Sequence, residues 1–421
     1  MNCKHALIKK LTFFEVIVPL VITGFIGQGM HLVNFVVSAN SRWILFLILA
    51  LYFLCNARLL LKLPNTLLWV LWVYLLWCAS TMVWSEAFIL SCVKSISLIF
   101  IITVMISTGY AWVQRKQWQH SLSWLFLLTI LVFLSGILGR GAIATASYAD
   151  QPVLYTGLTG SPNLFGVFQA MILPYLLWQA YSNWRRKHKK FLLSAIAVIF
   201  NLIFLILSSS RSAILMAISV VLFFFLSMNL KNKYIVLSTM AVLALGIGTL
   251  TSISLNALIY KSYNGDVFNS RRYVWMTSYQ QALLGGWIGG GYGVSIGNGE
   301  FSMVNLNAAN YGREKSSSQL GIIEETGIIG LCLYLLVLVV YFAIVCRFWI
   351  TLKSSSNFKV MLGLIIGAMF GIILVSVFEA WWDAPASNES IYFWTLFGTS
   401  FGLIHAIKRT PSGDIHHISH A

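Results

Sequence analysis

The chain has 421 residues, of which 58% are hydrophobic and only 10% are charged, against about 25% charged residues in soluble domains. This composition excludes a water-soluble globular protein and predicts one that is embedded in a membrane. The net charge of +16 does not indicate nucleic-acid binding, because the basic residues lie in short clusters between apolar segments. The six cysteines include no CxxC pair and predict no disulfide framework.

Twelve apolar segments have the length expected of membrane helices, which need about 20 residues. The first contains Glu15 and has no cleavage site after it, so we expect a retained helix rather than a signal peptide. In chain order the predicted spans are 12–30, 43–61, 67–84, 88–108, 122–139, 163–182, 191–208, 213–229, 234–252, 328–347, 360–380 and 391–407.

The distribution of charge predicts which loops face the cytoplasm. With the N-terminus inside, 19 of the 28 Lys and Arg residues fall in inner segments, as the positive-inside tendency requires. Among the acidic residues, only Glu15 and Asp414 are not on the outer side. We therefore expect both termini in the cytoplasm and two long outer segments, at about 140–162 and 253–327.

These segments divide the chain into four parts. We expect five N-terminal membrane helices, then helices six to nine with an outer loop at 141–162, then one large outer loop, and finally three helices with a cytoplasmic tail. The corresponding ranges are 1–140, 141–252, 253–327 and 328–421. Function concentrates in loops that a rigid scaffold holds, so we expect the site on the outer face.

One outer motif places an arginine at the membrane surface. In the sequence LSSSRSA, which ends at Ala213, Arg211 lies in a very short turn between two apolar helices, at the depth of lipid phosphates. The alternative is an arginine that merely extends to the headgroups.

A second motif, SRRYVW, places two arginines in the first turn of an outer-loop helix. Ser270 is the candidate N-cap, Arg271 and Arg272 follow it, and Gly285 and Gly286 end the helix. A helix N-terminus favours an anion, and guanidinium groups add bidentate contacts to phosphate. The alternative is a solvated amphipathic helix.

Two further stretches of the large outer loop stand out. Glycines in GGGYG, at Gly289–Gly293, allow backbone to approach a ligand closely, although a flexible turn explains them on their own. Glu324 and Glu325 lie just before a predicted span, where one of them is a candidate general base. The alternative for both acids is charge placed at a helix start.

Several features predict packing rather than chemistry. TGSPN, ending at Asn163, is typical of a turn and helix start, and the GxxxG-like series from Gly363 to Gly371 predicts a helix-packing face. Glu15 and Lys94 are charges within spans, placed too far apart in depth to pair directly. His31 is the one histidine expected outside, so no metal site is predicted there.

In their order, spacing and membrane side, these motifs resemble the O-antigen ligase and O-antigen polymerase superfamily, which also includes exopolysaccharide polymerases. The resemblance covers roughly residues 155–345 and ends in EETGIIG. It implies an all-α polytopic fold like that of C-type glycosyltransferases, with about twelve membrane helices and one large periplasmic loop, in the bacterial inner membrane. It also implies an undecaprenyl-pyrophosphate-linked glycan donor, an acceptor glycan, and an inverting, metal-independent transfer that needs no cofactor.

The resemblance also assigns roles to residues. Arg211 and Arg271 match arginines that bind the donor diphosphate, with Arg272 as a neighbour that could substitute. Ser316 stands nine residues before Glu325, where family ligases usually have a histidine. A serine cannot act as that base at neutral pH, which disfavours the ligase reaction. The candidate bases are then Glu314, Glu324 and Glu325, and the remaining substrate-binding candidates are Arg313, Lys315 and Ser316.

The leading hypothesis is a polymerase that joins lipid-linked repeat units for O antigen or exopolysaccharide, with chain-length regulator and flippase proteins as further partners. The alternative is a ligase that moves a finished glycan to lipid A core or another acceptor. A third hypothesis, a transporter or flippase, rests on the helix count and on Lys94.

Overall fold

The computed structural model describes residues 13–139, 141–142, 154–228, 269–296, 315, 317–352, 356–382 and 384–409. Within these ranges the regular structure is helical, apart from one antiparallel pairing of two short strands. Those strands are β1 (Gly141–Ala142) and β2 (Leu154–Tyr155).

The N-terminal helices are α1 (Phe13–Ile26), α2 (His31–Val36), α3 (Ala39–Cys55), α4 (Asn65–Ser80), α5 (Phe88–Arg115) and α6 (Phe126–Leu138). Short 3-10 turns are η1 (Gly27–Gly29), η2 (Ala57–Leu59), η3 (Thr81–Trp84), η4 (Trp118–His120) and η5 (Ser123–Leu125). The later helices are α7 (Pro162–Arg185), α8 (Phe191–Leu207), α9 (Arg211–Ser227), α12 (Asn269–Gly285), α13 (Ser318–Thr351), α14 (Asn357–Ser376) and α15 (Asn388–Arg409).

The described part of the chain contains seven helices long and apolar enough to cross a membrane: Asn65–Trp84, Phe88–Arg115, Trp118–Leu138, Pro162–Arg185, Ser318–Thr351, Asn357–Ser376 and Asn388–Arg409. Four shorter apolar helices coincide with other predicted spans: Phe13–Gly29, Asn40–Cys55, Phe191–Leu207 and Arg211–Ser227. The predicted span 234–252 lies outside the described residues. The chain is therefore an α-helical membrane protein, and the count of twelve spans stays a prediction.

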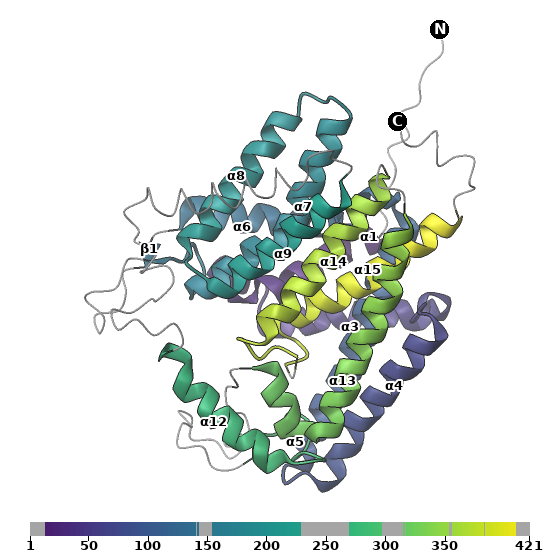
Figure 1. Ribbon diagram of the computed structural model, residues 1–421, viewed down its shortest axis with the longest axis vertical. Coiled ribbons are helices and arrows are strands. Elements are labelled where there is room, and N and C mark those ends of the chain that lie inside the picture. Colours follow the sequence, from purple (N-terminus) through teal and green to yellow (C-terminus); the bar gives the residue numbers. More distant parts are fainter. Residues whose placement is uncertain are drawn as a thin grey trace.

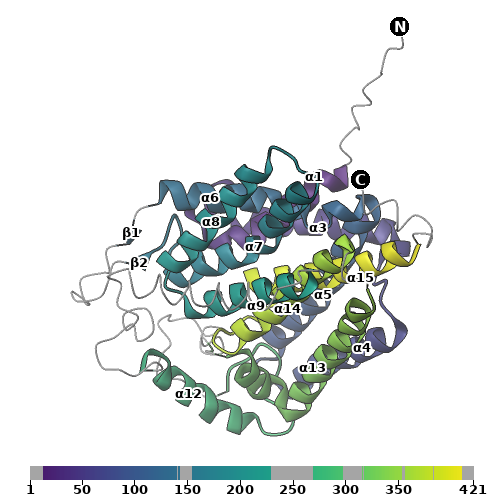
Figure 2. The same cartoon turned by 45° about the horizontal axis from the view of Figure 1, so that its top comes forward.

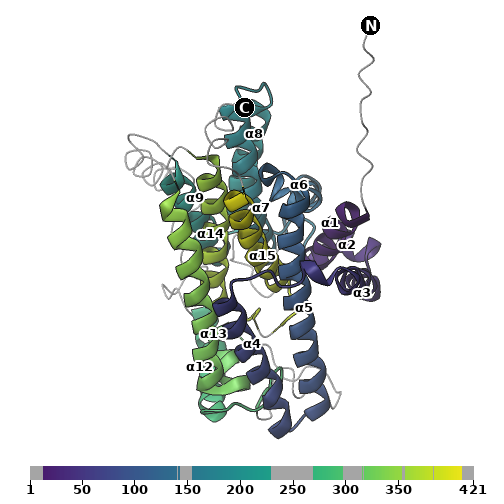
Figure 3. The ribbon, with the colours of Figure 1, turned by 90° about the vertical axis from the view of Figure 1, so that its right-hand side faces the viewer.

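The long helices share one general direction, and α12 runs across it (Figures 1 and 2). The α7–α8 turn lies at one end of this bundle, and α12 lies at the other end together with the Phe88 end of α5 (Figures 1 and 3). Helices α5 and α15 pack closely against each other, as do α9 and α14, and α14 and α15 are the most buried of the seven candidate spans. Almost nine-tenths of an 18-residue apolar stretch of α15 is buried.

Glycines allow both pairs to approach at the backbone. Gly109 of α5 faces the Thr395 carbonyl of α15, where any Cβ would overlap it. The predicted glycine face of α14 is confirmed, because Gly363, Gly367 and Gly371 all lie directly against α9. Such packing replaces the hydrophobic driving force that helices lack inside a bilayer.

The two charges expected within spans have separate partners, as their different depths predict. Glu15 of α1 pairs with Lys116 at 2.6 Å. Lys94 of α5 donates to the backbone carbonyl of Gly293 at 2.7 Å. A paired or hydrogen-bonded charge is far less costly in a membrane than an isolated one.

We expect Gly109→Ala to destabilise the protein, because the added methyl must push α5 away from α15. The effect should be about 1–3 kcal/mol, as for other overpacked sites. Gly160→Ala is the matched control, since a Cβ there meets nothing within 4 Å. Unfolding of both variants in detergent micelles would check this, and equal stability of the two would contradict the packing described above.

Candidate functional site

Helix α13 is broken near its start. Gly327 has φ 74° and ψ −177°, so a nine-residue helical segment, Ser318–Thr326, is set off from the membrane-spanning part that follows. A side chain at this φ would be strained, and a Cβ would overlap the Trp287 backbone. The predicted span at 328–347 thus begins at the break, and the last nine residues of the predicted loop 253–327 before Gly327 are already helical.

The break leaves backbone groups without their usual partners four residues away, and one short segment satisfies them. The N–H of Ile328 donates to the Gly286 carbonyl at 3.0 Å, and the N–H of Ile329 donates to that of Trp287 at 3.2 Å. In return, the N–H groups of Gly290 and Gly291 donate to the carbonyls of Glu324 and Glu325, both at 2.9 Å. Two donors and two acceptors are thus exchanged between the broken helix and residues 286–291.

The two carboxylates of this segment bind the same glycine-rich stretch. Glu325 accepts the Gly293 N–H at 2.7 Å through Oε2, and its Oε1 pairs with Lys315. Glu324 accepts the N–H of Ile296 at 2.9 Å. Both glutamates and Lys315 are buried. Through these contacts the two glutamates hold the glycine-rich segment in place. They are not charges at a helix start, because both lie at the end of the helical segment Ser318–Thr326.

Residues from η3 and α5 hold the other side of the stretch Gly289–Gly293. Trp84 donates its indole N–H to the Gly289 carbonyl at 3.0 Å, and Thr81 accepts the Tyr292 N–H at 2.9 Å. Lys94 completes the set through Gly293. The interpretation of GGGYG as a flexible turn is therefore wrong, because bonds from η3, α5 and the first segment of α13 hold its backbone.

The start of α13 is joined to the connection between α14 and α15. The Ser318 hydroxyl accepts the backbone N–H groups of Trp381 and Trp382 at 3.0 and 3.2 Å. Gln319 donates to Ser376 Oγ at 2.8 Å. Beneath this connection, Trp382 donates its indole N–H to the Tyr74 hydroxyl of α4 at 2.7 Å. A buried aromatic cluster thus supports the short segment from the membrane side.

Arg211 is the first residue of α9 and is half-buried. Its turn is tight: Ser209 has φ 51°, and Ser208 and Ser210 are buried against α7, where a Cβ on Gly166 would overlap both. The predicted helix start at TGSPN is confirmed, since α7 begins at Pro162. The structure therefore packs the LSSSRSA turn against the first turns of α7, which begins within TGSPN about 45 residues earlier in the sequence.

The register of α9 against α14 places Arg211 near the end of α14. Gly371 lies against Met216, and the helices are antiparallel (Figure 1), so Arg211 is level with Ser376. Trp275 of α12 contacts Phe378 just beyond, with ring centroids 5.9 Å apart. Arg271 lies one helical turn before Trp275. The starts of α9 and α12, which carry Arg211 and Arg271, are therefore both near the Ser376 end of α14.

Helix α12 confirms the predicted helix end at Gly285, and it begins at Asn269, so Ser270 lies inside it rather than at its cap. Among the side chains of α12 that the structure describes, the outward face exposes Met276, Tyr279, Leu283 and Leu284 beside Gln280, whereas Ser278 on the opposite face is 1% exposed. Trp287, which follows the helix, is 69% exposed. A solvated amphipathic helix would bury its apolar side chains; a mostly apolar outward face is typical of a helix that rests in a membrane interface.

Several of the predicted site residues are not among those that the structure describes. Arg313, Glu314 and Ser316 are not among the described residues, and of Arg271 and Arg272 only the helical backbone is described. Among described residues, no group of three or more His, Cys, Asp or Glu side chains is placed to hold a metal ion.

No pattern in the sequence predicted the residues that support the broken helix. Trp77, which donates to the Thr326 carbonyl at 2.9 Å, and Trp84 and Thr81 all come from a part of the chain more than 200 residues away. Gly327 carried a usable signal, because a glycine at the start of a predicted span is an expected place for a helix break.

No protein-family model matches the chain, and no curated protein is significantly similar to it in sequence. The class that the fold itself defines is an α-helical membrane protein with a broken helix, held by a glycine-rich segment, at one end of its bundle.

We expect Lys315→Met to destabilise the protein by about 3–5 kcal/mol, because it leaves the buried Glu325 carboxylate without its cation. The double variant Lys315→Met/Glu325→Gln removes both charges and keeps an acceptor for Gly293, so it should recover most of this loss. A double-mutant cycle on unfolding in micelles measures the coupling. Additive effects of the two substitutions would show that the pair is not coupled.

Proposed function

We propose that the protein is a glycosyltransferase that polymerises lipid-linked glycan repeat units, with its site at the end of the bundle where α9, α12, α13 and α14 meet. The donor is a glycan on undecaprenyl pyrophosphate, and the product serves O-antigen or exopolysaccharide synthesis. The observation that carries the proposal is the convergence of Arg211 and the arginine-bearing start of α12 on one end of α14.

Two arginines at this position suit a diphosphate that leaves from a lipid. The bond between the sugar C1 and the pyrophosphate oxygen breaks, and a new bond forms from C1 to an acceptor hydroxyl oxygen. Guanidinium groups neutralise the charge that develops on the leaving diphosphate. The apolar outward face of α12 suits a helix lying in the outer interface, which would hold Arg271 at the depth of the donor's phosphates.

The acceptor proton must pass to a base. Glu324 and Glu325 are the described candidates, but both are buried and hydrogen-bonded to the glycine-rich segment. Their contacts favour a positioning role. Glu314 is therefore the first acidic residue to test as the base, by substitution with glutamine and measurement of the rate against pH.

Arg211→Ala and Arg271→Ala should each lower the rate of polymerisation by about 10²–10³-fold, as for the loss of one group that stabilises transition-state charge. Purified protein is incubated with an undecaprenyl-pyrophosphate repeat unit, and products are sized on a gel. Arg58→Ala, an exposed arginine of η2 on the predicted inner side, is the control. Unchanged ladders in both arginine variants would contradict the proposal.

The same assay separates the alternatives. A ladder from donor alone indicates a polymerase, whereas product only after addition of a lipid A core acceptor indicates a ligase. Transport in place of either reaction would require Lys94 to act as more than a hydrogen-bond donor to Gly293. Lys94→Ala abolishing function while the arginine variants keep it would favour the transporter.

We further propose that the protein lies in a bacterial inner membrane with both termini in the cytoplasm. A fluorescent protein that folds only in the cytoplasm should therefore be bright when fused after Ala421. The same reporter inserted in the loop 253–327 should be dark, because the positive-inside distribution places this loop outside. The opposite pattern of brightness would reverse the orientation and with it the membrane side of the site.

A further inference from the structure

The turn between α7 and α8 lies at the opposite end of the bundle from α12 (Figure 1). It is firmly built. Lys187 has φ 50°, its N–H donates to the Trp184 carbonyl at 3.0 Å, and the His188 N–H donates to that of Asn183 at 2.9 Å. Asn183 also donates to Ser194 of α8 at 2.7 Å. The side chains of this turn are therefore presented from a defined backbone.

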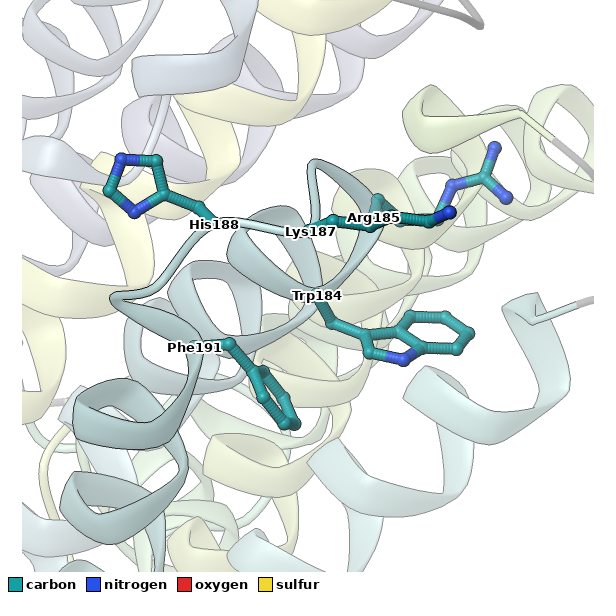
Figure 4. Close-up of a pocket in the computed structure, with 5 residues that line it drawn as sticks. All are labelled: Trp184, Arg185, Lys187, His188 and Phe191. Carbon is teal, nitrogen blue, oxygen red and sulfur yellow. The ribbon is translucent and has the colours of Figure 1, made fainter.

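A hollow of about 450 Å³ opens at this turn, lined by Trp184, Arg185, Lys187, His188 and Phe191. This volume lies within the range of about 300–1,000 Å³ that is usual for small-molecule sites. In Figure 4 the rings of Trp184 and Phe191 lie below the turn, the Lys187 and Arg185 side chains extend in the same direction above them, and the His188 ring points the other way. The hollow thus has an aromatic side and a cationic side.

The positive charge around the hollow has no acidic residue near it in the sequence. Five of the six residues 185–190 are Lys or Arg, and the chain has no Asp or Glu between Asp150 and Asp266. Arg185 and Lys187, held on the same side of the turn, repel one another unless an anion lies near both. A phosphate group supplies that charge and matches the guanidinium fork.

An apolar surface continues from the hollow along α8. Directly after Phe191, exposed apolar side chains recur at helical spacing on one face: Leu192, Leu193, Ile196, Ile199, Phe200 and Ile203. Helix α7 is long and apolar enough to cross a membrane and ends at Arg185. With α7 as a membrane span, the hollow falls at headgroup depth and the apolar face of α8 falls below it, among acyl chains.

We propose that this hollow binds the phosphate headgroup of an anionic phospholipid whose acyl chains lie along the exposed face of α8. The cationic side recognises the phosphate, and Trp184 lies at the polar–apolar boundary that indole rings favour. A basic pocket between membrane helices is a known form of site for anionic lipids. The proposal does not depend on the proposed glycosyltransferase activity.

To test this, the full-length protein is equilibrated in mixed micelles of phosphatidylglycerol and phosphatidylcholine and then exchanged out of them. Native mass spectrometry measures how much phosphatidylglycerol the protein retains. Arg185→Gln/Lys187→Gln should weaken retention of phosphatidylglycerol by about ten- to thirty-fold, taking each cation at its usual contribution near a membrane surface. The control, Arg58→Gln/Lys62→Gln, removes two cations elsewhere on the same predicted side. Arg185→Lys/Lys187→Arg keeps the charges and should keep the lipid.

Three outcomes would overturn the proposal. Equal losses in the site and control variants would mean that surface charge alone attracts the lipid. Equal retention of phosphatidylcholine would remove the role of anionic charge. Displacement of phosphatidylglycerol by millimolar glycerol phosphate would show a site for a soluble phosphate, because a bound lipid also gains from its acyl chains on α8. Melting temperatures of all variants distinguish loss of lipid from loss of folding.

Discussion

The exchange of hydrogen bonds at Gly327 is the constraint on which the α12 end of the molecule depends. A helix interrupted beside a membrane exposes backbone donors and acceptors that lipid cannot satisfy, at a cost of several kcal/mol for each group. Here residues 286–291 take over both sides of the interruption. This fixes the end of α12, the glycine-rich stretch after it and the start of α13 as one unit.

Close packing elsewhere sets the position of that unit. The glycine contacts of α14 with α9 fix the depth of Arg211, and Ser318 ties the start of α13 to the connection that follows α14. The aromatic cluster around Trp382 then joins this connection to α4. Through these contacts the start of α9 and the start of α12 are both held at the same end of α14.

The two ends of the bundle use positive charge differently. At one end, arginines begin helices α9 and α12, and the buried Lys315 neutralises Glu325. At the other, the α7–α8 turn carries its cations beside aromatic rings and an apolar helix face. The same charge therefore supports a proposed reaction with a lipid diphosphate at one end and a proposed resting site for a phospholipid at the other.

The sequence by itself determined that the protein lies in a membrane, where most of its helices run, and that α14 has a glycine packing face, because lipid demands long apolar helices and close packing demands small residues. Arg211 was recognisable for the same reason, since its turn between two apolar runs can lie only at the surface. Only the tertiary structure decided the roles of GGGYG, Glu324 and Glu325. The glycine-rich stretch is the partner of both acids and is itself held by Thr81, Trp84 and Lys94, which are about 200 residues away from it. A local pattern carries no information on which distant backbone groups a helix break will need.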